Sequence, residues 1–158
     1  MPEKIKLDSM DWAILRVLQR DSSLPVHAIG EVVGLSTNPC WRRIKRMEDA
    51  GIIRDRVALL DPKKIGLGTT VFVAIRTNRH DPEWLAAFSE GIAAIEEITE
   101  CHRMAGDIDY MLKLRVADIA DYDRIYQRLI AKVPGLADVT STFSMEEMKS
   151  TTALPRPS

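Results

Sequence analysis

The sequence predicts an α+β protein, with an N-terminal winged helix-turn-helix domain and a C-terminal ferredoxin-like βαββαβ domain. Three short helical segments separated by tight breakers occupy the first 50 residues. The remaining chain alternates β-branched strands with two longer helical stripes in the order β-α-β-β-α-β. A chain of 158 residues has room for two small domains.

The first two predicted elements are helices. Residues 7–19 show the i, i+4, i+7 apolar spacing of an amphipathic helix, which Asp8 or Ser9 would cap. A shorter helix over residues 27–33 is expected to stop at Gly34, because glycine adopts the left-handed conformation that ends helices.

The third predicted helix, over residues 36–50, has two different faces. Ser36 would cap it, and Pro39 is tolerated in the first turn. On a helical wheel the apolar positions are Cys40, Ile44 and Met47, and the opposite positions are Asn38, Arg42, Lys45 and Arg46. We therefore expect the apolar face to pack against the other helices, and the opposite face is cationic. The tight Gly-Leu-Ser junction before this helix is typical of a helix-turn-helix, whose last helix enters the DNA major groove.

An extended run follows and marks a boundary. Residues 52–60 alternate Arg54 and Arg56 with apolar neighbours, and a turn-rich stretch begins at Asp61. We predict a helix-turn-helix domain over 1–51, a linking strand or hinge over 52–66, a βαββαβ domain over 67–150 and a tail over 151–158.

The βαββαβ domain is predicted from β-branched content, alternation and helix-start signals. Its expected strands cover 69–77, 97–104, 108–116 and 136–145, and its helices begin near residues 81 and 118. Asp81 and Pro82 begin the first of these helices, whose buried stripe would be Trp84, Leu85, Phe88 and Ile92. Pro134 and Gly135 end the second helix.

Composition and charge exclude several classes of protein. Hydrophobic residues (46%) and charged residues (28%) occur in the proportions that are typical of globular proteins. No run approaches the ~18 apolar residues of a membrane span, and no signal peptide precedes the first helix. The first 60 residues hold ten basic and eight acidic side chains, whereas the remainder holds 12 and 15. The first 60 residues therefore have a net positive charge, and the remaining residues have a net negative charge.

The sequence contains no pattern typical of catalysis or of a metal site. His27, His80 and His102 lack the neighbours of a zinc site, and no catalytic triad or phosphate-binding loop is present. Cys40 and Cys101 are too few for a disulfide framework, which fits a reducing cytoplasm. We therefore expect that the protein is not an enzyme and that it binds no cofactor.

The cationic helix is the first candidate functional surface. Its cations would neutralise phosphates, and its outward side chains would reach base edges. The plainer alternative is a solvated cationic face. The candidate DNA-binding residues are Ser36, Thr37, Asn38, Pro39, Trp41, Arg42, Arg43, Lys45 and Arg46.

The run 106–110, Gly-Asp-Ile-Asp-Tyr, is the second candidate. Exposed amides and a carboxylate there would bind both ends of a small zwitterion such as an amino acid. The alternative is a hairpin turn with acidic tips, and spacing does not decide between them. Cys101, just ahead of this turn, is either an inert buried thiol or part of the same site.

Three runs in order carry a resemblance to a known family: residues 33–43, 58–62 and 106–110. With them the chain resembles, over residues 6–152, the Lrp/AsnC (feast/famine) family of transcriptional regulators. The runs 57–68, 103–106 and 133–141 are most similar to its cysteine-responsive DecR-type branch. Asn38 departs from the residue that many relatives carry, so the base preference stays open.

The resemblance implies a recognition helix over 37–50 and an effector-binding domain that also pairs subunits. Family members are dimers that commonly assemble into octamers, with the amino acid held between dimers. The effector loop would be 104–110, and a neighbouring subunit would add contacts from the last strand. The candidate effector-binding residues are Cys101, Arg103, Met104, Ala105, Gly106, Asp107, Asp109, Tyr110, Thr140, Ser141 and Thr142.

We therefore expect a cytoplasmic, sequence-specific DNA-binding transcriptional regulator. Its DNA binding or assembly would respond to a small amino acid, which the resemblance implies to be cysteine. The expected partners are double-stranded DNA, the amino acid and further copies of the chain, as a homodimer and an octamer, with no membrane. The alternative is a nucleoid-associated or ligand-sensing oligomerisation module with mainly non-specific DNA binding.

Overall fold

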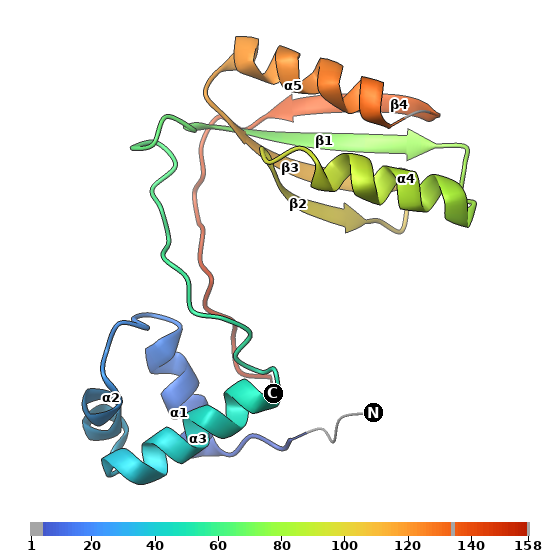
Figure 1. Ribbon diagram of the computed structural model, residues 1–158. Coiled ribbons are helices and arrows are strands. Elements are labelled where there is room, and N and C mark those ends of the chain that lie inside the picture. The colour runs from blue at the N-terminus through green and yellow to red at the C-terminus, as the bar shows by residue number, and fades with distance from the viewer. Residues whose placement is uncertain (1–4, 134, 158) are drawn as a thin grey trace. The chain divides into compact units, whose positions relative to one another are not determined.

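The computed structural model describes residues 5–133 and 135–157, which form two compact units (Figure 1). One unit holds the chain up to Ala58 together with the segment from Met148 onward, and we call it the helical unit. The other, the sheet unit, holds Leu59–Glu147. No helix among the described residues is both long and apolar enough to cross a bilayer.

The helical unit contains α1 (Ser9–Leu18), α2 (Val26–Val33) and α3 (Thr37–Asp49), as the sequence predicts. Asp8 caps α1: its carboxylate accepts a hydrogen bond from the Asp11 amide at 2.8 Å. The Asp11 carboxylate accepts one from the Asp8 amide at 3.1 Å, so two amides at the helix start are satisfied reciprocally. Ser36 occupies the cap position of α3, but its hydroxyl makes no capping bond there.

The turn between α2 and α3 is tight. Gly34 ends α2 with φ 75°, in the left-handed region predicted for it. At Gly30 an added Cβ would lie 2.6 Å from the carbonyl oxygen of Leu35, so only glycine lets the turn pass this close. The three helices enclose one apolar core, made of Ile14, Leu15, Leu18, Ile29, Cys40, Ile44 and Met47.

Of the two alternatives for residues 52–66, a linking strand or a hinge, the strand is not formed within the described chain. This segment pairs with none of the described strands, and a strand needs a neighbour to complete its hydrogen bonds. Val57, Leu59 and Leu60 leave their apolar side chains largely exposed. Residues 62–66 form turns instead, closed by the Leu67 amide donating to the Pro62 carbonyl at 2.8 Å.

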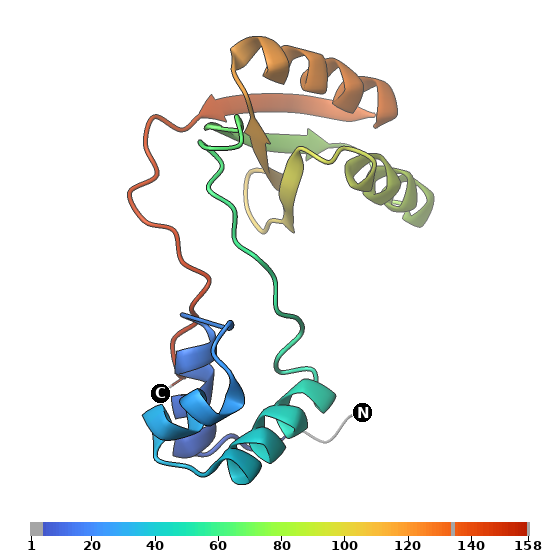
Figure 2. The same cartoon turned by 60° about the vertical axis from the view of Figure 1, so that its left-hand side comes forward.

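The sheet unit confirms the predicted βαββαβ order. Its elements are β1 (Thr69–Thr77), α4 (Pro82–Ala93), β2 (Ile98–Arg103), β3 (Tyr110–Val116), α5 (Ile119–Lys132) and β4 (Leu136–Phe143). The sheet order is β2-β3-β1-β4, and all neighbouring strands are antiparallel. Both helices cover the same face of the sheet (Figures 1 and 2). Pro134 lies outside the described residues.

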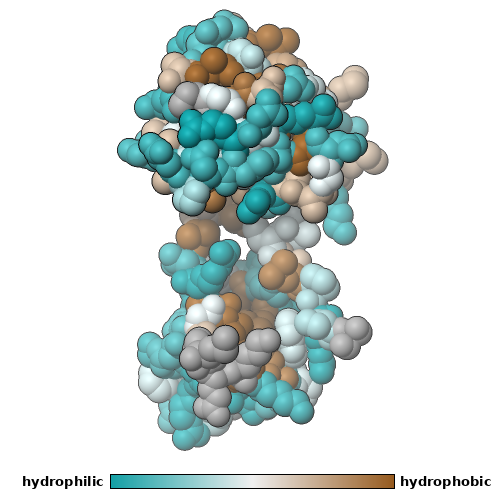
Figure 3. All heavy atoms as spheres, turned by 90° about the vertical axis from the view of Figure 1, so that its right-hand side faces the viewer, coloured by the Kyte–Doolittle hydropathy of each residue, from teal (hydrophilic) through white to brown (hydrophobic). Residues whose placement is uncertain are grey.

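The core of the sheet unit lies between the helices and the alternate strand residues that face them. Trp84 and Phe88 of α4 pack there, but Leu85 is 38% exposed, so its prediction as a buried residue is wrong. Leu85 lies roughly 100° around the helix from Trp84, beyond the stripe that reaches the sheet. The opposite, open face of the sheet carries Phe72, 39% exposed, and Met111, and neither α4 nor α5 covers it. Hydrophobic patches are visible among hydrophilic surface on both units (Figure 3).

Candidate nucleic-acid interface and effector loop

The predicted recognition helix, α3, packs through one side only. Cys40, Ile44 and Met47 are buried against the other two helices, as predicted. Among the remaining candidate DNA-binding residues Pro39 and Arg43 are half-buried, and the exposed ones are Ser36, Thr37, Asn38, Trp41, Arg42, Lys45 and Arg46. The exposed residues extend from the cap of α3 over its first three turns, where a helix in the major groove meets base edges.

Two predicted DNA-binding arginines are bound to carboxylates of the N-terminal helix region. Arg43 donates to Asp8 at 2.7 Å and to Asp11 at 2.8 Å, and Arg46 donates to the other oxygen of Asp11 at 2.5 Å. The Asp11 side chain is fully buried, so its charge depends on these two guanidinium groups. We call these four residues the α1–α3 ion cluster.

The ion cluster fixes the orientation of α3 against α1. The pKa of Asp8 falls from 3.8 to about 2, because its carboxylate accepts the Asp11 amide bond and then the bond from Arg43. The same carboxylates raise the pKa of the Arg43 guanidinium. Two of the four cations on α3 are thereby neutralised within the protein, which lowers the charge that α3 offers to DNA phosphates.

Sequence reasoning missed this cluster, although a signal was present. Asp8 and Asp11 stand three apart, and so do Arg43 and Arg46. Residues three apart share a helix face, so two acidic and two basic side chains with the same spacing can pair across neighbouring helices. The helical wheel of one helix shows which side chains share a face, but it does not show what lies opposite them.

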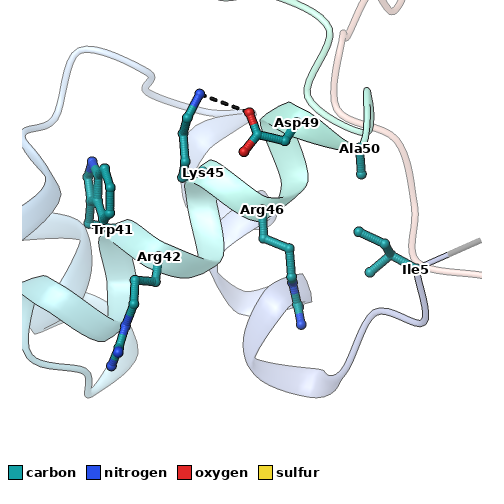
Figure 4. Close-up of a pocket in the computed structure, with 7 residues that line it drawn as sticks. All are labelled: Ile5, Trp41, Arg42, Lys45, Arg46, Asp49 and Ala50. Atoms are coloured by element: carbon teal, nitrogen blue, oxygen red, sulfur yellow. Dashed lines mark ion pairs between the residues drawn. The ribbon is translucent and has the colours of Figure 1, made fainter. Parts of the chain in front are cut away.

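The outward face of α3 holds the other two cations (Figure 4). Lys45 forms an ion pair with Asp49 at 2.9 Å, which raises the pKa of its ammonium group. Arg42 has no carboxylate within 4 Å among the described residues. Trp41, 54% exposed, lies on the same side of the helix as Lys45, whereas Arg46 extends toward α1. An open hollow of about 500 Å³ lies along this face, and Ile5 forms its far wall.

The predicted effector loop lies between β2 and β3 and is held by Asp109. The Met104 amide donates to the Asp109 carbonyl at 2.8 Å, and the Asp109 amide donates to the Ile75 carbonyl at 2.9 Å. One carboxylate oxygen of Asp109 accepts the Thr77 amide at 2.8 Å, and the other lies 3.9 Å from His80. Asp109 therefore anchors the loop to the end of β1.

The tip of the loop is open to solvent. Gly106 has φ 139°, a conformation that favours glycine, and Asp107 beside it is exposed. Met104 and Ala105 are exposed as well. The tip thus offers backbone amides and the Asp107 carboxylate at one place, which are the groups that the two ends of an amino acid require.

Other effector candidates have different surroundings. The Tyr110 ring is buried in the core, with its centroid 4.3 Å from that of Phe88. Cys101 and Arg103 are exposed on the edge strand β2, so the alternative of a buried thiol at Cys101 is wrong. Free cysteines are commonly buried, but the edge strand β2 is only partly covered.

The candidates on β4 do not reach the loop within one chain. Thr140 pairs with Ala74 and Thr142 with Phe72, which places both on the open face of the sheet. Ser141 faces the helices, where it shares a hydrogen bond with the Tyr122 hydroxyl. Because β1 lies between β4 and β3, a whole strand separates Thr140 and Thr142 from the strand that follows the effector loop.

Within the described part of the chain, no group of three His, Cys, Asp or Glu side chains is arranged to hold a metal ion. The geometry instead combines a helix with a cationic, aromatic outer face and a separate sheet unit with an exposed polar loop. The first suits a DNA groove, and the second suits a small zwitterion.

Comparisons with known proteins agree with this division of roles. The AsnC-type helix-turn-helix domain matches residues 7–48, and the Lrp/AsnC ligand binding domain matches residues 70–154. DNA-binding transcriptional activator DecR of Escherichia coli (strain K12) is 50% identical over 149 residues, covering 94% of this chain and 98% of the relative. Glutamate uptake regulatory protein of Zymomonas mobilis is 51% identical over 152 residues, covering 96% and 92%.

Experimental structures show the same architecture. A crystal structure of an AsnC family transcriptional regulator from Agrobacterium tumefaciens has a TM-score of 0.91 and 54% identity, covering 94% of this chain and 97% of that one. A transcriptional regulator from Neisseria meningitidis in complex with L-Met has a TM-score of 0.89 and 33% identity, covering 95% and 97%. The chain therefore belongs to the Lrp/AsnC family of transcriptional regulators, with an AsnC-type helix-turn-helix and a ligand-binding domain.

Proposed function

We propose that the chain is a cytoplasmic, sequence-specific transcriptional regulator that inserts α3 into the DNA major groove and responds to a small amino acid. The observation that carries this proposal is the outer face of α3, where Trp41, Arg42 and Lys45 are exposed while Arg43 and Arg46 lock the helix onto α1. A rigid helix with few free cations depends on base contacts more than a uniformly charged one does. This supports the specific regulator over a mainly non-specific, nucleoid-associated module. We assign the chain no catalytic role.

We propose that the loop 104–110 holds the amino acid. The Asp107 carboxylate would bind the ammonium group, and the exposed amides around Gly106 would bind the carboxylate. Relatives at 40% and 33% identity are named as leucine-responsive and as an L-Met complex, which supports an amino acid as the ligand class. The resemblance to the DecR-type branch makes cysteine the first ligand to test.

We also propose a homodimer that assembles further, to an octamer. The open sheet face, with Phe72 and Met111, supplies an apolar surface for a second copy. Assembly would also bring Thr140 and Thr142 of one copy toward the effector loop of another. The effector site would then be complete only between subunits, so that binding the amino acid changes the assembly or the spacing of the DNA half-sites.

Fluorescence anisotropy on the chain's own upstream DNA tests the proposal. The measurement is made at fixed salt with excess random DNA, with and without millimolar cysteine, leucine, methionine and glutamate. We expect binding that survives the competitor and shifts with one amino acid. By linkage, operator DNA must then change the affinity for that amino acid by the same factor. Binding that the competitor abolishes, and that no amino acid alters, would support the nucleoid-associated module instead.

A further inference from the structure

The C-terminal segment of the described chain docks on α1. The Gln19 carboxamide contacts both backbone groups of Leu154: its oxygen accepts the Leu154 amide at 2.6 Å, and its nitrogen donates to the Leu154 carbonyl at 3.5 Å. Ala153, next to this contact, is half-buried, and its amide donates to the Thr151 hydroxyl at 3.1 Å. One side-chain amide thus pairs with both the N–H and the carbonyl of Leu154, and this double contact fixes the position of the segment along α1.

A pocket of about 210 Å³ lies between α1 and this segment. Three arginines line it, Arg16 and Arg20 from α1 and Arg156 from the docked segment, and no acidic residue does. None of the three has a carboxylate within 4 Å among the described residues, whereas Arg43, Arg46 and most other arginines of the chain do. Trp12 forms an aromatic wall of the same pocket.

Arg16, Arg20 and Arg156 are exposed and line one pocket without an acidic residue, so the pocket carries a positive charge that attracts anions. A folded chain that brings Arg156 beside Arg16 and Arg20 therefore favours an anion at this place. The planar guanidinium fork matches the oxygens of a phosphate group and can bind them in pairs. The pocket volume also exceeds the roughly 30 Å³ of one water molecule several times over, which leaves room for a phosphate group with part of its hydration.

We propose that this pocket is an anion site that binds a phosphate group. The phosphate belongs either to the DNA backbone beside the operator or to a small phosphorylated molecule in solution, since both present the same oxygens. The site is separate from the outer face of α3 and from the effector loop, so it does not depend on the function proposed for either. Because docking of the segment supplies Arg156, phosphate binding and docking stabilise each other.

Calorimetric titration of the full chain with inorganic phosphate tests the site directly. Chloride is exchanged for phosphate at constant ionic strength, and no DNA is present. We expect saturable binding that weakens about tenfold or more in Arg16→Gln and in Arg156→Gln, because each removes a charge-assisted hydrogen bond donor. Gln19→Ala changes no charge but releases the segment, so we expect a several-fold weakening there. Lys149→Gln removes a charge from the same segment outside the pocket and should have no effect.

The salt dependence of DNA binding identifies the source of the phosphate. If the pocket holds a backbone phosphate, Arg16→Gln lowers the slope of log affinity against log salt by about one, and Lys149→Gln does not. If the pocket holds a free phosphorylated molecule, the slope stays unchanged while inorganic phosphate still binds. The proposal is overturned if wild type binds no inorganic phosphate and the Arg16→Gln slope equals that of Lys149→Gln. Circular dichroism and the melting temperature show that each variant is folded. Because the calorimetric arm contains no DNA, loss of operator binding would not affect it.

Discussion

Arginines on one helix have two different physical roles. Arg43 and Arg46 bind a fully buried carboxylate, Asp11, whereas Arg42 has no such partner among the described residues. Sequence reasoning placed all of them on the DNA-binding surface, because a helical wheel reports direction and not the partner. A buried charge without its partner is costly, so the stability of the helical unit depends on Arg43 and Arg46 and not on Arg42.

Arginine-to-alanine variants separate these roles. We expect Arg42→Ala to weaken DNA binding while changing the unfolding free energy by no more than about 0.5 kcal/mol, as at other exposed sites. Arg43→Ala leaves Asp11 with one partner, and we expect it to lower the unfolding free energy by about 1–3 kcal/mol. Urea unfolding and fluorescence anisotropy measure the two effects. Equal stability of the two variants would mean that the ion cluster does not hold α3 in place.

The lowered pKa of Asp8 predicts an acid-sensitive contribution to stability. Its folded value is about 2, below the ordinary 3.8, so the contribution is fully present above about pH 4 and disappears as the pH falls toward 2. Asp8→Asn keeps a capping oxygen but removes the charge. The difference in unfolding free energy between wild type and Asp8→Asn should therefore shrink across this range. A difference that does not vary with pH would contradict the assignment.

Substitutions of Asp107 and Asp109 are predicted to have different effects, although the two residues are close in sequence. Asp107→Ala should weaken the response of DNA binding to the amino acid without lowering the melting temperature, because its carboxylate is exposed at the loop tip. Asp109→Ala should lower the melting temperature, since the Thr77 amide loses its acceptor. Asp109→Asn keeps an acceptor and serves as the control. An unaltered amino-acid response in Asp107→Ala would reduce the loop to a structural turn.

Among the elements, the three helices of the helical unit and all helices and strands of the βαββαβ domain are present as predicted, and their ends differ by at most two residues. Apolar periodicity and capping residues are local signals, so one sequence suffices to read them. The strand alternative for residues 52–66, which stood beside a hinge, is not formed for the opposite reason. Its alternating residues satisfy the local pattern, but a strand is a property of two segments, and the second one is not supplied by the described chain.

The α2–α3 turn depends on the missing side chain of Gly30. We expect Gly30→Ala to lower the unfolding free energy by about 1–3 kcal/mol, because the new methyl group would collide with the backbone carbonyl of Leu35. The collision outweighs the ~1 kcal/mol that alanine gains over glycine within a helix. Gly68→Ala is the matched control, since its methyl group would meet Lys63 at an ordinary 3.6 Å. Unchanged stability of Gly30→Ala in urea unfolding would show that the turn can relax.

At the scale of the whole molecule, assembly through the open sheet face predicts that a charge placed on this face changes the oligomeric state, and that a charge placed on α4 does not. Phe72→Lys places a charge in that face and should shift the dimer toward monomer in light-scattering chromatography. Leu85→Lys alters an equally exposed apolar residue on α4 and should leave the dimer intact. Circular dichroism checks that both variants are folded. A Phe72→Lys protein that stays dimeric would move the interface elsewhere.

The contact between Gln19 and Leu154 makes the helical unit discontinuous in sequence. During synthesis on the ribosome α1, α2 and α3 emerge first, but the segment that docks on α1 emerges only after the whole sheet unit. The part of the protein that reads DNA is therefore finished last, although it begins the chain. A purification tag fused just beyond the docked segment would therefore sit beside α1, in the part of the molecule that forms last.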